Sequence, residues 1–280
     1  MNQTRARLRE LLARPGIVLA PFVYDCIQAK LAVRAGFEAV YMTGFGTAAA
    51  RGYPDLGLLT MSEMVDNVRA ISRAVAAPVI CDADTGYGNP LNVWRTVREY
   101  EDAGAAALHI EDQVWPKRCG FLAGKQVIPM EEMAAKVRAA CGARRDPNLV
   151  IIARTDALQS NGWDDVTRRA RAYRDAGADL LFVDGIRTRE ELDRYARELC
   201  QIPCLYNGAL APAAELAALG FKLTIHTGTL TAAFERTRDL MLELKQHGTI
   251  AAGRAPGLFS EMLDVLGVPQ YQAIEDQYAR

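Results

Sequence analysis

Four stretches of the chain repeat one pattern of hydrophobic and polar residues, in which an amphipathic helix ends at a glycine and an apolar strand follows at once. The stretches are LAVRAGFEAVYMTG, YEDAGAAALHIED, YRDAGADLLFVDG and LAALGFKLTIHTG. The glycines Gly36, Gly104, Gly177 and Gly220 stand where a helix needs a left-handed residue before the chain enters a strand. The pattern therefore predicts alternating helices and strands.

Four further apolar runs fill the intervals, near residues 16–22, 77–84, 149–156 and 202–208. Like the first four strands they lack clean polar alternation, which is typical of parallel strands covered on both faces. Eight strand–helix units in about 250 residues predict an α/β fold of the (β/α)8 TIM-barrel type. A doubly wound open sheet is the alternative, but it usually has fewer strands and often a GxGxxG turn, which this sequence lacks.

The end of the chain continues beyond the eighth strand. We expect residues 1–247 to form the barrel, and 248–280 to form a linker and a C-terminal helical extension of the same domain. Phe259, Met262, Leu263 and Leu266 follow the spacing of one apolar helix face. That face can pack on its own barrel or on a neighbour, and we expect a homo-oligomer, either a dimer or a tetramer.

Composition narrows the class of partner. Half of the 280 residues are hydrophobic, the net charge is −1, and no basic stripe suggests a nucleic-acid surface. No apolar run reaches the roughly 20 residues of a membrane span, and the N-terminal residues lack the apolar core of a signal peptide. We therefore expect a cytoplasmic protein with six reduced cysteines and a small-molecule partner.

Acidic residues follow two of the predicted strands: Asp82 and Asp84 after one, Glu111 and Asp112 after the next. Two like charges about 5 Å apart repel by about 3 kcal/mol at an effective dielectric of about 20, so such a cluster needs protons or a cation. Asp82 and Asp84 leave the same strand face, although capping of loop N–H groups is an alternative use of such residues. We expect Glu111, rather than Asp112, to face the barrel centre.

The ligand types favour Mg²⁺, or Mn²⁺, over zinc. Carboxylate oxygens suit Mg²⁺, whereas the histidines His109, His226 and His247 are scattered and the six cysteines contain no C-x-x-C pair. His109 shares the strand parity of Glu111 but lies deeper. We expect it to be a hydrogen-bonded core residue.

Two further segments carry candidate chemistry. Arg154 ends an apolar strand. We expect its planar guanidinium to bind a substrate carboxylate or to pair with Asp184. The loop WPKRCGFLAGK places Cys119 beside Lys117 and Arg118, which can lower a thiol pKa and make it available for proton transfer. The alternative is a buried loop cysteine without a catalytic role.

The ordered motifs YMTGFGTAAARGYPDLGLLT, CDADTGYGN, HIEDQVWPKRCG and ARTDA together resemble the isocitrate lyase and phosphoenolpyruvate mutase superfamily. The KRCG loop resembles that of its carbon–carbon bond lyases, which include methylisocitrate lyase, dimethylmalate lyase and petal death protein-like enzymes. The resemblance implies Mg²⁺, a 2-oxo or 2-hydroxy carboxylate substrate, an enolate-like intermediate and a mobile loop. Cys119 is then the acid that protonates the carbanion.

The resemblance also implies a role for each matching residue. Asp84 is the direct metal ligand, and Asp82, Glu111 and Asp55 act on the metal through water. Tyr41, Thr43 and Gly44 form the carboxylate clamp, and Tyr41 assists removal of a hydroxyl proton. The remaining catalytic and substrate-binding candidates are Lys117, Arg118, Arg154, Phe45, Gly120, Phe121, Asp184, Asn207 and His226.

Several positions depart from the superfamily's pattern. Phe121 stands where methylisocitrate lyases have histidine, Asp184 where glutamate is common, and Phe45 where a small residue is usual. Thr43 replaces a frequent serine, and Asn207 is all that remains of an Asn-x-Thr-Glu segment. These changes suggest a substrate with fewer polar groups than a tricarboxylate.

The leading hypothesis is an Mg²⁺-dependent lyase that cleaves a substituted malate or related 2-hydroxydicarboxylate by retro-aldol chemistry. An oxaloacetate decarboxylase or hydrolase is the first alternative. A phosphonopyruvate-type enzyme acting on a C–P bond ranks lower, and a barrel that binds a metabolite without turnover, in a regulatory or structural role, also stays open.

Overall fold

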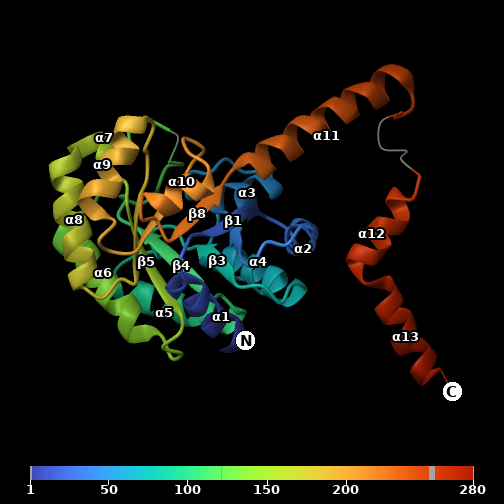
Figure 1. Ribbon diagram of the computed structural model, residues 1–280, viewed down its shortest axis with the longest axis horizontal. Helices are drawn as coiled ribbons and strands as arrows, with labels where there is room; N and C mark the ends of the chain where they lie inside the picture. The colour runs from blue at the N-terminus through green and yellow to red at the C-terminus, as the bar shows by residue number, and fades with distance from the viewer. Residues whose placement is uncertain (1, 121, 252–255, 280) are drawn as a thin grey trace.

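The computed structural model describes residues 2–120, 122–251 and 256–279. Eight parallel strands pair in chain order and the last closes on the first. The strands are β1 (Val18–Val23), β2 (Val40–Met42), β3 (Val79–Asp82), β4 (Ala107–Glu111), β5 (Val150–Thr155), β6 (Leu180–Val183), β7 (Cys204–Asn207) and β8 (Leu223–His226). The predicted (β/α)8 barrel is confirmed (Figure 1).

Helices separate the strands and surround them (Figure 1). They are α1 (Asn2–Ala13), α2 (Cys26–Arg34), α3 (Gly44–Ala50), α4 (Met61–Ala74), α5 (Pro90–Ala103), α6 (Met130–Ala143), α7 (Leu158–Asn161), α8 (Trp163–Asp175), α9 (Arg189–Leu199) and α10 (Ala213–Ala218), followed by α11 (Gly228–His247), α12 (Leu258–Leu266) and α13 (Val268–Tyr278). The four predicted helix-ending glycines all have φ between 91° and 106°, the left-handed conformation that glycine adopts most readily.

Two apolar layers make up the core. The inner layer fills the barrel and includes Leu8 and Leu11 of α1 together with residues such as Val18 and Leu223 at the starts of strands. Helix α1 therefore closes the end of the barrel where the strands begin. The outer layer lies between the strands and the surrounding helices. Burial at the closed end leaves the opposite end, where the strands finish, as the place for a pocket.

The C-terminal helices α11, α12 and α13 bury fewer residues than most of the helices around the barrel. Helix α11 follows β8 but extends away from the barrel, and none of its residues is buried (Figure 1). Helix α12 then lies against α2, and large apolar side chains such as Phe234 and Phe259 are about two-thirds exposed. The helices predicted beyond β8 are confirmed, whereas the division at residue 247 stays a prediction.

Among the described residues no helix is long and apolar enough to cross a membrane.

Candidate active site

A pocket opens where the strands end, and most of the predicted substrate-binding residues line it. Its walls are Phe22, Tyr41, Thr43, Phe45, Asp55, Asp82, Cys119, Gly120, Arg154, Phe182, Asp184 and Asn207. These residues come from β1, β2, β3, β5, β6 and β7, from α3, and from loops such as the one between β4 and α6, so segments far apart in the chain converge there. Phe22 and Phe182 were not predicted, because an aromatic residue within an apolar strand gives no signal of which side it faces.

Asp82 ends β3 and is held from several directions. Its Oδ2 accepts from the Gly44 N–H at 3.2 Å and from the Tyr41 hydroxyl at 3.4 Å, and its Oδ1 accepts from the Asp84 N–H at 2.9 Å. A Cβ on Gly44 would lie 2.5 Å from Asp82 Oδ2, so only glycine allows this approach. Asp82 is therefore fixed at the floor of the pocket.

Tyr41 and His109 form a buried pair beside Asp82. The Tyr41 hydroxyl lies 2.7 Å from His109 Nε2, and both side chains are buried. Burial and the Asp82 charge raise the pKa of Tyr41 well above its ordinary value, while burial lowers the pKa of His109 to about 4. Both groups are neutral at pH 7, so Tyr41 is suited to donate a hydrogen bond. His109 has the core position that the sequence predicted.

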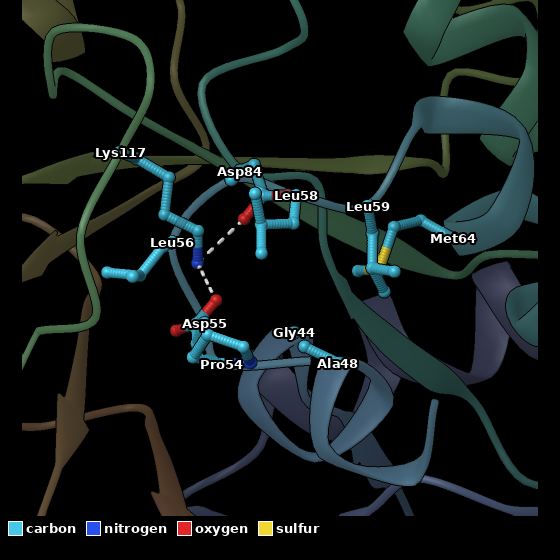
Figure 2. Close-up of a pocket in the computed structure, with 11 residues that line it drawn as sticks. Gly44, Ala48, Pro54, Asp55, Leu56, Leu58, Leu59, Met64, Asp84 and Lys117 are labelled. Atoms are coloured by element: carbon cyan, nitrogen blue, oxygen red, sulfur yellow. Dashed lines mark hydrogen bonds and ion pairs between the residues drawn. The ribbon is translucent and has the colours of Figure 1, made fainter. Parts of the chain in front are cut away.

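Lys117 connects two carboxylates beside Gly44 and α3. Its Nζ lies 2.9 Å from Asp84 Oδ1 and also pairs with Asp55, and all three side chains are buried (Figure 2). Asp84 has a φ of +46°, a rare conformation for a non-glycine residue that commonly marks a functional site. Burial raises the pKa of Asp84 to about 6 even with Lys117 nearby.

Glu111 and Asp112 point to opposite sides of β4, as expected. Glu111 is fully buried, and neither of its oxygens accepts a hydrogen bond from a described residue. Arg154 Nη1 lies 3.2 Å from Glu111 Oε2. Burial raises the pKa of Glu111 well above its usual range. We call the carboxylates Asp82, Asp84, Glu111 and Asp55, together with Lys117, the acidic side of the pocket.

Across the pocket, Arg154 is held by two aspartates. Its Nε and Nη2 donate to Asp156 at 2.8 and 3.0 Å, and Nη2 lies 3.4 Å from Asp184 Oδ2. The guanidinium carbon also lies 5.1 Å from the centre of the Phe182 ring. Lys125 binds the same two aspartates, at 2.8 and 3.1 Å. We call Arg154, Asp156, Asp184 and Lys125 the arginine side.

Asp156 and Lys125 were missed by the sequence reasoning. Asp156 lies two residues after Arg154, so equal strand parity was a signal that the two side chains could meet. Lys125 gave no such signal, because its partners lie 31 and 59 residues away in sequence.

The loop between β4 and α6 contributes Cys119 and Gly120 to the lining of the pocket. The Gln113 side chain bonds both the N–H and the carbonyl of Arg118, and the Cys119 N–H donates to the Asp55 carbonyl at 3.0 Å. Cys119 lines the pocket and is only 8% exposed. A Cβ on Gly120 would lie 2.3 Å from Asp184 Oδ2, so the loop backbone rests directly on the arginine side.

The other residues predicted for the site are Arg118, His226, Phe45 and Phe121. Arg118 and His226 are exposed and do not line the pocket, and the ring of His226 accepts from the Gly228 N–H. Phe45 lines the pocket but is 44% exposed at its rim. Phe121 lies outside the described residues, so its predicted contact with substrate stays a prediction.

The acidic side has the right chemistry for Mg²⁺. Its donors are carboxylate oxygens, and the buried oxygens of Glu111, which pair with Arg154 but accept no hydrogen bond from a described residue, can accept a further cation or a proton. Within residues 2–120, 122–251 and 256–279, no three His, Cys, Asp or Glu side chains are already grouped around a point for an ion. Lys117 accounts for part of this, since its ammonium is paired with Asp84. The Lys117 ammonium therefore competes with a cation for the Asp84 carboxylate.

Comparison with known proteins agrees with this arrangement. The family described as phosphoenolpyruvate phosphomutase matches residues 8–244. A 2,3-dimethylmalate lyase of Eubacterium barkeri is 43% identical over 99% of this chain and 98% of its own length. This chain belongs to the PEP mutase/isocitrate lyase superfamily. A 2-methylisocitrate lyase of Aeropyrum pernix is 40% identical over 98% of this chain and 90% of its own.

Solved structures of this superfamily share the whole fold. Oxaloacetate acetylhydrolase in complex with 3,3-difluorooxalacetate has a TM-score of 0.93 at 35% identity, covering 99% of this chain and 98% of that one. A 2,3-dimethylmalate lyase structure has a TM-score of 0.90 at 39% identity, covering 98% and 95%. A phosphonopyruvate hydrolase complex with oxalate and Mg²⁺ has a TM-score of 0.88 at 31% identity, covering 100% and 99%.

Proposed function

We propose that this protein is an Mg²⁺-dependent carbon–carbon lyase that cleaves a substituted malate or related 2-hydroxydicarboxylate into a 2-oxoacid and a second carboxylate. The observation that carries the proposal is the position of Cys119. Its thiol lies in a pocket with an acidic side suited to a cation and an arginine side suited to a carboxylate. Similarity to dimethylmalate and methylisocitrate lyases supports the same chemistry.

In this proposal the two sides bind different parts of the substrate. If Mg²⁺ is bound, Asp84 would be its direct ligand and Asp82, Glu111 and Asp55 would act on it through water; the ion would supply stabilisation of negative charge on the substrate oxygens. Arg154 binds a substrate carboxylate, and Thr43 and Asn207 line the same pocket. The Gly44 N–H donates to Asp82. The Oδ1 of Asn207 accepts no hydrogen bond from a described residue, which suits an amide that serves a ligand.

Cleavage requires removal of the hydroxyl proton, breaking of the C–C bond and protonation of the carbon that leaves as an enolate. Cys119 supplies that last proton, and the closed loop excludes water that would compete with it. The neutral Tyr41 hydroxyl is suited to donate to the substrate oxygen. The hydroxyl proton passes to the Asp82 carboxylate, which lines the pocket and lies within hydrogen-bond distance of the Tyr41 hydroxyl.

Product analysis tests the proposal. The protein is incubated with Mg²⁺ and, separately, with 2,3-dimethylmalate, 2-methylisocitrate, 2-alkylmalates, oxaloacetate and phosphonopyruvate, with EDTA controls, and NMR follows the products. We expect a 2-oxoacid plus a second carboxylate from a hydroxy acid, and none with EDTA. Turnover of oxaloacetate or phosphonopyruvate alone would contradict the lyase.

Oxaloacetate hydrolysis or decarboxylation is the second candidate. Three aromatic residues, Phe22, Phe45 and Phe182, restrict the pocket, which favours a small dicarboxylate. The similarity to oxaloacetate acetylhydrolase supports it. Oxalate plus acetate, or pyruvate plus CO₂, would identify this activity in the same NMR experiment.

We further propose that α11, α12 and α13 pack against a second copy of the chain. Exposed apolar residues such as Phe234, Met241 and Phe259 on these helices support this, since burial of each such side chain contributes about 1.5–3 kcal/mol. An apolar groove lined by Phe22, Leu31 and Phe37, among others, lies beside α2 and the start of α11. The assembly is a dimer or tetramer, acting in the cytoplasm as the reduced cysteines predict.

A further inference from the structure

We propose that Lys125 is a positioning residue that fastens the catalytic loop onto the arginine side, so that closing the loop and orienting Arg154 are one event. The loop here means residues 117–120 and 122–125. The inference deepens the proposed lyase function and rests on it only for its effect on turnover.

The Lys125 ammonium uses all three of its donors on three different parts of the site. Its Nζ donates to Asp156 Oδ1 at 2.8 Å, Asp184 Oδ2 at 3.1 Å and the Gly120 carbonyl at 3.0 Å. Its side chain is 1% exposed, so solvent does not screen these charges. One cation therefore ties the backbone beside Cys119 to the ends of β5 and β6.

The aspartates that receive Lys125 are the ones that hold Arg154. Asp156 binds the guanidinium through two hydrogen bonds, and its own N–H donates to Asp112 Oδ1 at 2.9 Å. Asp112 in turn accepts from the Thr155 hydroxyl and from Tyr173, both at 2.7 Å, and from Arg169 at 3.1 Å. Asp156 is thus a rigid anchor, and Lys125 connects the loop to it.

Charge explains why a second cation is needed. Asp156, Asp184 and Glu111 all lie near Arg154, whose single charge cannot balance three carboxylates. With Lys125 in place, the aspartates share two cations. Without it, Asp184 competes for Arg154, and the guanidinium has less capacity for a substrate anion. Opening of the loop and loss of substrate binding then go together.

The two ends of the loop are fastened in the same way. Lys117 pairs with Asp84 and Asp55 on the acidic side, as Figure 2 shows, while Lys125 pairs with Asp156 and Asp184 on the arginine side. Cys119 and Gly120 lie between these two contacts. The Lys125 contact does not involve the predicted metal ligands Asp82, Asp84 and Glu111, so it holds the loop whether or not Lys117 has moved to admit a cation.

The test measures alkylation of Cys119 in Lys125→Met, which keeps the length of the side chain but removes its charge. Iodoacetamide labelling is followed by peptide mass spectrometry, which separates Cys119 from the other five cysteines. We expect alkylation of Cys119 to rise about tenfold, because local opening becomes more frequent. With Mg²⁺ and oxalate present, we expect less protection of the variant than of the unmodified protein.

Turnover gives the second readout. Lys125→Met should lower kcat by about 100-fold through loss of loop closure, whereas Lys125→Arg, which keeps the charge, should retain turnover within about tenfold. Lys222→Met is the matched control, since Lys222 lies beside the start of β8 at the opposite end of the barrel. We expect this control to match the unmodified protein in both readouts.

The outcomes separate the inference from the proposed function. If the rate of Cys119 alkylation in Lys125→Met is within about twofold of the rate in Lys222→Met, Lys125 does not hold the loop closed and the inference is wrong. If Cys119 is alkylated faster in Lys125→Met but the unmodified protein has no lyase activity, the role of Lys125 in holding the loop is supported and the proposed lyase function is refuted. If Lys125→Met does not fold, Asp184→Asn removes one of the two negative charges that pair with Lys125 and should raise Cys119 alkylation in the same way. An unchanged rate would overturn the inference.

Discussion

The two sides of the pocket carry similar carboxylates in opposite states. On the acidic side, Glu111 has no hydrogen-bond donor among the described residues and Asp84 has a pKa raised to about 6 by burial. On the arginine side, Asp156 accepts from Arg154 and Lys125, and these cations lower its pKa below the usual range. Burial acts on both sides, so the difference comes from the number of cationic partners and, at Asp84, from the neighbouring charges of Asp82 and Asp55.

That difference indicates what each side binds. Carboxylates short of partners attract a cation, whereas an arginine already oriented by aspartates attracts an anion at low entropic cost. Cys119 lies between them on the loop, where it can reach a substrate held from both directions. The predictions below test this division, starting with the residue that lies between the two sides.

Cys119→Ser should give the largest effect. We expect kcat to fall by about 10³-fold, because a serine hydroxyl is a much weaker acid than a thiol in the same position. Binding of Mg²⁺ and oxalate, measured by calorimetry, should stay within about threefold, since neither side of the pocket changes. Near-normal turnover would exclude the acid role of Cys119.

Asp84→Asn should break the acidic side alone. We expect Mg²⁺ affinity to fall by about 100-fold, because ligand charge governs affinity for a hard cation. Calorimetric Mg²⁺ titration measures this, with Asp102→Asn as a control, since Asp102 is a surface carboxylate. Equal Mg²⁺ affinity in Asp84→Asn and the control would show that the acidic side does not hold the ion through Asp84.

Arg154→Lys should break the arginine side alone. Lysine keeps the charge but loses the planar fork that Asp156 orients, so we expect the Kd for oxalate in the presence of Mg²⁺ to rise about tenfold. The exposed Arg95→Lys is the control. Unchanged oxalate affinity, measured by calorimetry, would place the anion-binding residue elsewhere.

Changes in the C-terminal helices should leave both sides intact. Phe234→Asp with Phe259→Asp should shift the assembly toward a 30.7 kDa species in light scattering, because both side chains are exposed and apolar. Mg²⁺ and oxalate affinities should change by less than about twofold, since residues 228–251 and 256–279 do not line the pocket. A 30.7 kDa species in the unmodified protein at micromolar concentration would contradict the predicted oligomer.

Some residues of the site could be predicted from the sequence, and others could not. Strand parity placed Glu111 toward the barrel centre and Asp112 away from it, and the motif after β3 identified Asp82 and Asp84. Asp156 and Lys125 were absent from the predicted site, because partners far apart in sequence leave no local pattern. His226 ends its strand as predicted, but its ring bonds the Gly228 N–H and lies outside the pocket lining.

The sequence by itself determined the barrel, the eight strands and the end at which they open. Hydrophobic periodicity and helix-ending glycines act over a few residues, so they are visible in the chain. Only the tertiary structure decided how the charges pair: Lys117 with the acidic side, Lys125 with the arginine side, and Asp156 with Arg154. These pairings depend on which strand ends and loops meet in space, and on burial that makes each unpaired charge costly.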